Sequence, residues 1–458
     1  MRLAEVVKKQ VSQRRTEAPT MHGPDARGTG VTPEPSMPRR VSRRSMAVAA
    51  FSTVVEWYDF TLYLYFATVL ARVFFGSASG ASLGATLGGF AIAYLMRPLG
   101  AVVFGHVGDR FGRRRTMLLS MALMTAAMLA TALLPTFDQV GPIAGWLLLL
   151  LRCVMAFSVG GEYTGVVAYL LEGASDGRRG LVTSLAAAAS EVGALLAAGV
   201  AAVTVSATAG AALDSWGWRI PFLIGAALAA GVWIVRSSME ESPDFVRQQA
   251  TGTVPSAPIR QVLAAQRTGI ARGFAISALG SITYYVGITY VPAFLSSTGG
   301  LAEGAALWFS TAAALVVIAV TPLVGYLSDA VGRRPVLLGA CGCAAVLPVA
   351  MFLLMSGGAP GPVLGGVLVL AALGGAVSAV GAVASAEQFP GEGRLSGLAL
   401  GVTSATAIFG GLAPYLAHLM IEHTGSPLVP GIMIALVAAA VLPVLLGMGE
   451  TRPAAGHE

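Results

Sequence analysis

Carboxylate side chains lie inside apolar stretches of this sequence that are each long enough to cross a lipid bilayer. They are Glu56, Asp59, Glu162 and Glu191. An ionised group is costly in such surroundings, so each of these residues is by default a candidate for function. Apolar surroundings also favour the protonated form of a carboxylate, which lets it exchange a proton near neutral pH. The alternative role for each residue is a buried ion pair that holds two helices in register.

Arginine side chains in the same stretches could bind an anionic solute. Arg152 precedes Glu162 by ten residues, which on a helix separates them by about 15 Å of rise and about 80° of rotation. The two can therefore line one cavity but cannot pair directly, and Glu162 is expected within reach of the arginine-rich motif described below. Arg219 opens another apolar run, in WGWRIPF. For both arginines, binding a substrate carboxylate competes with tying two helices together.

Charged residues inside apolar runs are concentrated in the first half of the chain. The runs of the second half are almost uncharged, although His418 lies inside one of them. We therefore expect the first half to carry proton and charge recognition, and the second half to supply aromatic and small surfaces. The tyrosines that we expect to contact a substrate are Tyr63, Tyr284 and Tyr285.

A charged motif occurs twice, about half a chain apart. Residues 105–115 read GHVGDRFGRRR between two apolar runs, and residues 325–334 read GYLSDAVGRR. Asp109 and Asp329 occupy the same place in the two copies and are 220 residues apart. Self-similarity at this spacing indicates two related halves that share one order of helices. The motif residues that we single out are Gly105, Asp109, Arg110, Gly112, Arg113, Arg114, Asp329, Gly332, Arg333 and Arg334.

The composition is that of a membrane protein. Apolar residues make up 55% of the chain and charged residues 11%, whereas soluble domains carry roughly 25% charged residues. The mean hydropathy is +0.74. A helix needs about 20 mostly apolar residues to span a bilayer, and we count twelve such runs, which predicts an all-α polytopic membrane protein. The predicted spans are 46–72, 81–104, 116–134, 143–171, 181–208, 218–236, 268–296, 305–327, 336–356, 362–388, 397–422 and 429–448.

The twelve runs form two sets of six, separated by a polar segment that contains Pro243, Pro255 and Pro258. Basic residues gather in segments that would share one face of the membrane, including ten in the polar N-terminal tail. This bias predicts a multi-pass protein of the cytoplasmic membrane with both termini inside the cell. The usage of alanine, glycine and arginine predicts a bacterial source. We predict a disordered basic tail at 1–44, a six-helix half at 45–236, a cytoplasmic linker at 237–267, a second six-helix half at 268–449 and a short cytoplasmic tail at 450–458.

Several classes of function are disfavoured. The net charge of +6 is explained by the one-sided distribution of basic residues, so we expect no nucleic-acid partner. The three cysteines all lie in apolar runs and indicate neither a disulfide framework nor a metal site. The sequence contains no P-loop, metal-ligand cluster or Ser-His-Asp arrangement, so we expect neither an enzyme nor a cofactor. We expect a protein that functions as a monomer in the lipid bilayer and is driven by a proton gradient.

Motifs along nearly the whole chain carry a family resemblance. They are EWYDF at 56–60, RPLG at 97–100, SVGGEY at 158–163, WGWRIPF at 216–222, FGG at 409–411 and the repeated charged motif. The chain resembles a major facilitator superfamily transporter, and in particular the metabolite:proton symporter family, which includes carriers for proline/betaine, shikimate, 2-oxoglutarate and citrate. The resemblance implies that Asp109 and Asp329 latch neighbouring helices on the cytoplasmic side, with the arginines as partners. That latch would break and re-form during alternating access.

We therefore expect a secondary active transporter that takes up a small, polar, carboxylate-bearing metabolite together with a proton. Arg152 or Arg219 would hold the carboxylate, and Asp59 and Glu191 would couple the proton. Glu191 is an addition to the family pattern, and it could instead face the ammonium group of a zwitterion or cation.

Two alternatives remain open at this stage. The first is an exporter that expels a drug or secondary metabolite in exchange for protons, and a more remote one is a membrane sensor that does not transport. The sequence also departs from the family pattern at Ser52, Met155, Val402 and Thr406. Because these positions are expected to line the cavity, no relative's substrate can be assigned to this chain.

Overall fold

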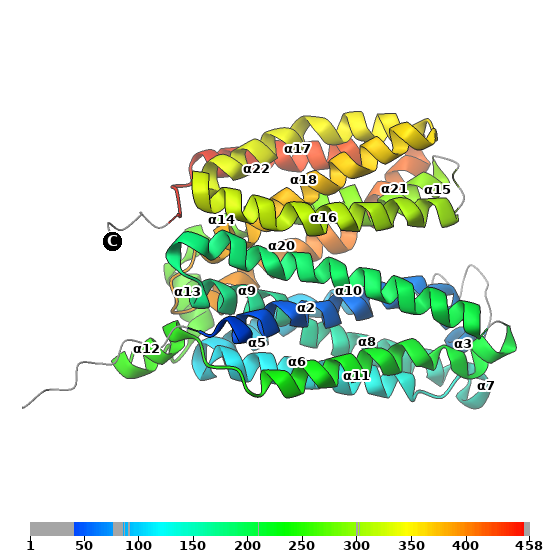
Figure 1. The fold of residues 1–458 in the computed structure, drawn as a ribbon, viewed down its shortest axis with the longest axis horizontal. Coiled ribbons are helices and arrows are strands. Elements are labelled where there is room, and N and C mark those ends of the chain that lie inside the picture. Colours follow the sequence, from blue (N-terminus) through cyan, green and yellow to red (C-terminus); the bar gives the residue numbers. More distant parts are fainter. Residues whose placement is uncertain are drawn as a thin grey trace, which may run out of the picture. The chain divides into compact units, whose positions relative to one another are not determined.

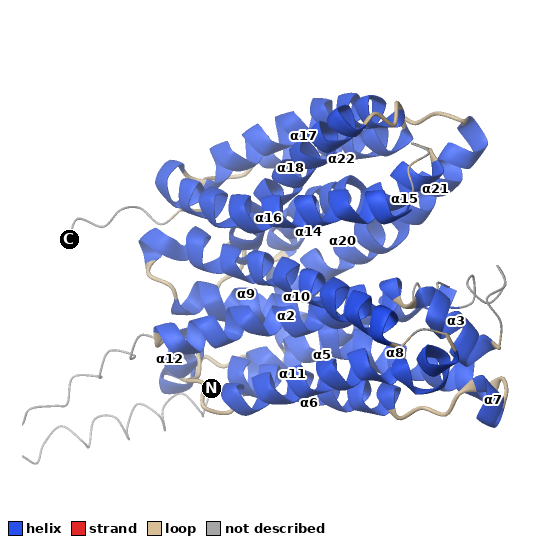
Figure 2. Cartoon of the chain, turned by 45° about the vertical axis from the view of Figure 1, so that its right-hand side comes forward, coloured by secondary structure: helices blue, strands red, loops and turns tan. Residues whose placement is uncertain are grey.

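The computed structural model describes residues 41–76, 86, 88–89, 92–208, 210–298, 301 and 303–452. Residues 40–458 form one compact unit. All regular secondary structure of the described residues is helical (Figure 2). Most of the predicted N-terminal tail, part of the second predicted span and the last six residues of the chain lie outside the described residues.

The first half consists of helices that correspond to the first six predicted spans (Figure 1). They are α2 (Arg43–Tyr65), α3 (Ala67–Phe75), α5 (Met96–Phe111), α6 (Arg113–Ala132), α7 (Phe137–Val140), α8 (Ile143–Gly160), α9 (Glu162–Gly173), η1 (Asp176–Arg178), α10 (Arg179–Ala207), η2 (Leu213–Gly217) and α11 (Arg219–Arg236). The segment predicted as a linker is partly helical, because two prolines start short helices at a position where the missing N–H costs nothing. These helices are α12 (Pro243–Thr251) and α13 (Pro258–Ala265).

The second half repeats the order of the first. Its elements are α14 (Arg267–Tyr284), η3 (Tyr285–Thr289), α15 (Val291–Ser297), α16 (Glu303–Val331), α17 (Arg333–Ser356), α18 (Pro360–Ala386), α19 (Arg394–Leu398), η4 (Ala399–Thr403), α20 (Ser404–Thr406), η5 (Ala407–Leu412), α21 (Ala413–Thr424) and α22 (Val429–Leu446). The π-helical segments η3, η4 and η5 interrupt the spans that begin with α14 and α19. Such irregularities are common at functional sites.

Nine helices of the described residues are long and apolar enough to cross a membrane. The other three predicted spans are 46–72, 81–104 and 268–296. The first and third appear as α2–α3 and as α14–η3–α15, and the second is described only in part. Large apolar side chains such as Trp146, Leu150, Trp308 and Leu436 are exposed on the helix surfaces, as expected for helices that face lipid. Each half has its own apolar core.

The repeated charged motif is helical except at one glycine, whereas the predicted spans end before it, at 104 and 327, and resume at 116 and 336. Helix α5 continues to Phe111 and α6 begins at Arg113, so that Gly112 alone makes the turn. Gly112 can do so because its φ is +108°, and Gly332 makes the equivalent turn with a φ of +117°. Only glycine adopts these angles without strain. We call the end of the bundle that carries these two turns the hairpin end.

The halves meet closely where α10 crosses α16 (Figure 1). A Cβ added to Gly180 would lie 2.5 Å from the carbonyl oxygen of Gly325, and one added to Gly325 would lie 2.7 Å from the carbonyl oxygen of Gly180. Within the first half, a Cβ on Gly193 would lie 2.3 Å from the carbonyl oxygen of Val54. Small residues therefore let the helix backbones touch, which is how helices associate where the hydrophobic effect cannot act.

We predict that Gly112→Ala destabilises the protein by about 1–3 kcal/mol, because the new side chain is strained at this φ. Its Cβ would also lie 2.3 Å from Oε2 of Glu241. Thermal unfolding of the detergent-purified protein measures the loss. Gly199→Ala is the matched control, because a Cβ at this helical position of α10 meets nothing within 4 Å. Equal unfolding temperatures for the two variants would contradict the role given to Gly112.

Candidate functional site

A cavity of about 170 Å³ lies between the two halves, and we call it the central cavity. The first half lines it with Glu56 of α2, Arg97 of α5 and Glu191 of α10. The second half lines it with Tyr284 of α14 and Tyr285 of η3. Its small hydroxyl side chains are Thr164, Ser190, Ser277, Ser281, Ser378, Ser385, Thr403 and Thr406. The three charged groups named here therefore come from the first half, whereas aromatic and small polar side chains come from both halves.

Arg97 is the arginine that reaches the central cavity. Its Nη1 lies 3.4 Å from Oε1 of Glu56, and its guanidinium stacks 4.6 Å from the ring centre of Tyr94 and 5.4 Å from that of Phe60. The other carboxylate oxygen of Glu56, Oε2, is buried and has no hydrogen-bond partner among the described residues. The pair is thus incompletely satisfied, and its long contact leaves the guanidinium able to accept another anion.

Glu191 and Tyr94 each contact a tyrosine of the other half. The hydroxyl of Tyr284 donates a hydrogen bond to Oε1 of Glu191, and the hydroxyl oxygens of Tyr94 and Tyr285 are 2.6 Å apart. Among the described residues no cationic side chain forms an ion pair with Glu191, although its side chain is almost fully buried. A buried carboxylate with only a hydroxyl partner changes its contacts when it gains or loses a proton.

Aromatic rings surround these groups. The Trp57 ring centre is 5.3 Å from that of Tyr284 and 5.3 Å from that of Phe60, and Trp57 lines the central cavity. Its indole Nε1 is buried without a hydrogen-bond partner among the described residues. Electron-rich faces of this kind attract cations as well as apolar groups.

Asp59 and Arg152 form a buried ion pair beside the central cavity. Nη1 of Arg152 lies 2.7 Å from Oδ2 of Asp59, and Nη2 donates to Oγ1 of Thr131 at 3.2 Å. Both line a separate pocket of about 30 Å³, which shares Glu56 and Arg97 with the central cavity. Oδ1 of Asp59 has no hydrogen-bond partner among the described residues.

One candidate tyrosine, Tyr63, and one candidate arginine, Arg219, lie away from the central cavity. Tyr63 donates to the carbonyl oxygen of Thr86 at 3.0 Å and packs on Arg152, with 5.2 Å between guanidinium and ring centre. Arg219 donates to the carbonyl oxygens of Ser215 and Leu134 at 3.2 and 2.9 Å. Arg219 therefore does not line this cavity, and its role in substrate binding stays a prediction that its backbone contacts do not favour.

Glu162 also lies away from the central cavity, and its partner differs from the expected one. Its carboxylate is fully buried and paired with Arg236 at the end of α11, not with the arginine-rich motif. Ser120 donates to it at 2.6 Å and Ser52 at 3.2 Å. Arg152 and Glu162 therefore do not share a cavity, and the Glu162–Arg236 pair joins α9 to α11.

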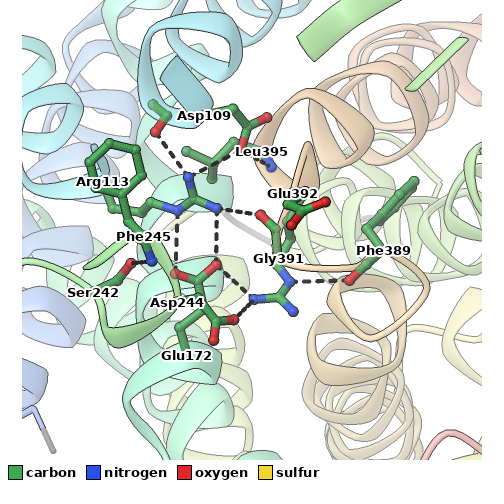
Figure 3. A network of polar contacts seen from close by, with 12 residues as sticks. Asp109, Arg113, Glu172, Ser242, Asp244, Phe245, Phe389, Gly391, Glu392 and Leu395 are labelled. Carbon is green, nitrogen blue, oxygen red and sulfur yellow. Dashed lines mark hydrogen bonds and ion pairs between the residues drawn. The ribbon is translucent and has the colours of Figure 1, made fainter. Parts of the chain in front are cut away.

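Asp109 joins the two halves at the hairpin end (Figure 3). Its carboxylate accepts the backbone N–H groups of Leu395 at 3.2 Å and Ser396 at 2.8 Å, in the first turn of α19. A carboxylate is favoured there because the N–H groups of a first helical turn have no partner within the helix. Arg113 lies 3.3 Å from Asp109, and Gly105 lets α5 approach the backbone at Leu395. We call this contact the first clamp.

The second clamp has the same construction with the halves exchanged. Asp329 accepts the backbone N–H groups of Gly180 and Leu181 at 2.8 Å each, in the first turn of α10. Arg333 lies 2.9 Å from Asp329. Both clamps are closed in this structure, so the halves are held together at the hairpin end.

Each clamp arginine also binds a second carboxylate. Arg113 pairs with Glu172 at 3.2 Å, and it donates to the carbonyl oxygen of Gly391 in the other half at 2.6 Å (Figure 3). Arg333 pairs with Glu387 at 3.1 Å. Each aspartate thus has a fully buried arginine beside it, and each arginine has two carboxylates to balance its charge.

The neighbouring arginines of the motif bind backbone groups or a ring. Arg114 donates to the carbonyl oxygen of Ser237, and Arg334 donates to that of Leu446 at 2.7 Å. Both contacts tie the start of one helix to the end of the sixth or twelfth span. Arg110 is exposed and lies over the ring of Phe111, at 5.4 Å from its centre.

Two glutamates cap the helices that follow the Gly112 and Gly332 turns. Glu241 accepts the backbone N–H of Arg113 at 2.9 Å, and Glu450 accepts that of Arg333 at 2.8 Å. Burial raises the pKa of Glu241 despite the N–H groups that it accepts. At Glu450 burial also acts to raise the pKa, but backbone N–H groups outweigh it and the pKa lies below its usual value. Glu450, the cap of the second half, therefore stays charged to a lower pH than Glu241, the cap of the first half.

Sequence reasoning missed several of these residues. Arg97 was visible as an intramembrane arginine, but nothing local distinguished it from Arg219. Glu172 and Glu387 are 215 residues apart, so a longer comparison of the two halves would have paired them. Arg236 ends an apolar run and offered no signal of its buried partner. Val402 and Thr406 do line the central cavity, as expected.

Comparisons with known proteins agree with this architecture. The family model described as Major Facilitator Superfamily matches residues 49–374. The solved structure of the proton:xylose symporter XylE, bound to 6-bromo-6-deoxy-D-glucose, superposes with a TM-score of 0.73 over 89% of this chain and 96% of that one. The sequence identity is 19%, so this similarity speaks for the fold alone.

Relatives with established activities are more similar in sequence. The alpha-ketoglutarate permease of Escherichia coli K12 is 35% identical over 379 residues, which are 82% of this chain and 87% of the permease. The ectoine/proline transporter of Corynebacterium glutamicum is 32% identical over 433 residues, 91% of this chain and 85% of the transporter. The citrate-proton symporter of Klebsiella pneumoniae is 32% identical over 390 residues, 84% of this chain and 86% of the symporter. The prediction of a transporter rather than an enzyme is thereby confirmed. This chain belongs to the major facilitator superfamily, and within it to the metabolite:proton symporters.

Proposed function

We propose that this protein takes up a small, carboxylate-bearing metabolite together with a proton. The observation that carries the proposal is the central cavity, where Arg97 offers a cation for an anionic group and Glu191 is a carboxylate without a cationic partner among the described residues. Relatives of similar length transport alpha-ketoglutarate, citrate, or ectoine and proline. These substrates are small and carry carboxylates, which agrees with a cavity of this size and charge.

Arg97 is the residue that we expect to bind the carboxylate. Its contact with Glu56 is 3.4 Å long, longer than a strong charge-assisted hydrogen bond of about 2.7–2.9 Å. A substrate carboxylate can therefore replace Glu56 at the guanidinium. Arg152, named above as a candidate, already has Asp59 at 2.7 Å and lines the small side pocket. We therefore assign substrate binding to Arg97 in its place.

Glu191 is the residue that we expect to couple the proton. Its hydrogen bond with Tyr284 links α10 of the first half to α14 of the second. Protonation of Glu191 removes a charge from the cavity and changes what it can accept from Tyr284, so the proton affects a contact between the halves. Asp59 and Glu56 are further candidates, because each keeps one buried carboxylate oxygen without a hydrogen-bond partner among the described residues. We assign a structural role to Glu162, which is closed off in its pair with Arg236.

A zwitterionic substrate is a second possibility that one observation favours. Of the described residues, two carboxylates but one arginine line the central cavity, so a substrate with several negative charges would have a single cationic partner there. An ammonium group could instead face Glu191, with the rings of Trp57 and Tyr284 beside it. Cations bind to such aromatic faces with about 0.5–2 kcal/mol. The carboxylate of the same molecule would lie at Arg97.

Transport then follows from alternate opening of the two ends of the cavity. We propose that residues 45–236 and 268–449 move as two halves, and that the hairpin end faces the cytoplasm together with both termini and the segment 237–267. The two clamps must open to release substrate on that side. The proton gradient supplies the energy, no cofactor takes part, and a monomer contains the complete cavity.

We expect that purified protein in liposomes acidifies the interior when its substrate is added outside. A pH-sensitive dye inside the liposomes measures this, against a panel of dicarboxylates, betaines and amino acids. Empty liposomes are the control. If no compound of the panel causes internal acidification, and protons move only when a preloaded compound leaves the liposomes, the result would contradict uptake and indicate an exporter.

We predict that Arg97→Lys raises the KM for a carboxylate substrate about tenfold, because lysine keeps the charge but loses the fork that binds both carboxylate oxygens. Initial rates of uptake into liposomes measure it. Arg219→Lys is the matched control and should leave KM unchanged, since Arg219 binds backbone carbonyl groups away from the cavity. The assignment fails if both substitutions raise KM equally.

We predict that Glu191→Gln abolishes substrate-driven acidification while exchange of labelled substrate across the membrane continues. The reason is that glutamine fills the same space and can still bind Tyr284 but cannot carry a proton. Glu422→Gln is the control, because this exposed carboxylate pairs with His418 and does not line the central cavity, so acidification should persist. Wild-type pH dependence in the glutamine variant would rule out Glu191 as the coupling residue. If Glu191→Gln loses the binding of betaines but not of dicarboxylates, the result would favour a zwitterionic substrate whose cationic group faces Glu191.

A further inference from the structure

The segment 237–267, which connects the two halves, lies across the closed hairpin end. Its helices α12 and α13 occupy that end of the bundle (Figure 1). Helix α13 packs against α5 of the first half and α19 of the second. Those two helices are the ones that the first clamp joins. The segment is therefore placed where it can act on that clamp.

The start of this segment is fixed to the first half. Tyr169 of α9 donates to the carbonyl oxygen of Glu240 at 2.8 Å, and the side chain of Glu240 accepts the backbone N–H of Ser42 at 3.0 Å. Glu241 caps α6, as described above. Phe245 of α12 is buried, and its ring lies 5.7 Å from the guanidinium of Arg113. Helix α12 is thus seated on the first half, next to the first clamp.

Helix α12 also contacts a residue of the other half, Arg394. Oδ2 of Asp244 lies 3.0 Å from Nη1 of Arg394, the residue directly before the N–H groups that Asp109 binds. The same Nη1 lies 2.7 Å from Oε1 of Glu172 in the first half. Figure 3 shows Glu172 and Asp244 side by side between the two halves. Arg394 is therefore held to the first half by one carboxylate directly and by another through the connecting segment.

Other contacts support the same attachment. Gln266 donates to the carbonyl oxygen of Glu392 at 3.4 Å. The side chain of Val262 in α13 is buried, and a Cβ on Gly393 would lie 2.5 Å from its Cγ2. The turn that leads into α19 thus packs directly on the segment, and it cannot move away without breaking these contacts.

Comparison of the pseudo-symmetric halves shows no such attachment at the second clamp in the part of the chain that the structure describes. Arg179 occupies the place of Arg394, because it precedes the N–H groups that Asp329 binds. Its ion-pair partner is Asp176, three residues before it and at 2.9 Å. The side chain of Arg179 is 30% exposed, and that of Asp176 71%, against 11% for Arg394 and 18% for Asp244. Two equivalent clamps therefore differ in what surrounds their arginine.

We infer that the segment 237–267 is a strap that holds the hairpin end closed, with Asp244 as the positioning residue that acts through Arg394. The inference rests on the proposed alternating opening of that end, but not on the identity of the substrate or on proton coupling. Opening separates α19 from α5 and must break the Asp244–Arg394 pair. The strap thus biases the conformational equilibrium toward the state closed at the hairpin end.

A cysteine placed in the cavity reports the opening directly. Cys153, Cys341 and Cys343 are first replaced by serine, and Ser385→Cys is introduced, because Ser385 is buried and lines the central cavity. A membrane-impermeant maleimide is applied without substrate to vesicles that expose the hairpin end. Asp244→Asn should increase the labelling rate about fivefold, the effect of a coupling at the lower end of the usual range. Asp244→Glu should restore the slower rate.

Two further variants separate the strap from a general loss of charge. Asp176→Asn removes the equivalent, exposed pair of the second clamp and should leave the labelling rate unchanged. Arg247→Ala removes the exposed partner that competes for Asp244 at 2.5 Å, so labelling should stay equal or become slower. Size-exclusion profiles show that each variant is folded. The reference protein, or parent, carries only the three cysteine-to-serine replacements and Ser385→Cys. If Asp244→Asn does not fold, faster labelling of Arg247→Ala than of this parent overturns the inference.

Labelling of Asp244→Asn at the parent rate would overturn the inference, as would an equal increase in Asp176→Asn. Failure of the proposed function would be seen in the acidification assay and not in the labelling assay. If the substrate panel produces no acidification, the labelling result still stands, because it is measured without substrate or a pH gradient.

Discussion

The carboxylate of Asp109 accepts two backbone N–H groups at the start of α19, and the closed state of the molecule depends on this contact. A buried carboxylate needs hydrogen bonds, and the first turn of a helix offers N–H groups without partners. Because the aspartate belongs to one half and the helix to the other, satisfying both also joins the halves. Arg113 neutralises the aspartate and is itself held by Glu172. Motion between the halves therefore has to exchange these partners for others.

The same device occurs twice, which follows from the internal repeat, but the two copies are not equivalent. The second copy has Asp329, Arg333 and Glu387 in matching places. The difference arises from the chain between the halves, which passes only the first clamp and adds Asp244 to Arg394. A pseudo-symmetric transporter can in this way be biased toward one state, since among the described residues Asp244 of the connecting segment has no counterpart at the second clamp.

Buried charged groups need partners in the central cavity as they do at the clamps, but in the cavity their partners are incomplete. At the clamps the buried ions are fully partnered. In and beside the cavity, counting only the described part of the chain, Glu56 and Asp59 each keep an unpartnered oxygen and Glu191 has only a hydroxyl. Incomplete partnering is unfavourable in a dry site. It is what a transport site requires, because substrate and proton must supply the missing interactions and later give them up.

The sequence by itself determined the helices, the repeat and the positions of the intramembrane charges, because apolar run length and motif spacing are local properties of the chain. It did not determine that the helices continue through the charged motifs to Gly112 and Gly332, where a single residue makes each turn. Only the tertiary structure decided that Arg97 rather than Arg219 reaches the cavity, and that Arg236 is the partner of Glu162. These pairings join helices far apart in the chain. Which faces meet is set by packing, and no local pattern encodes it.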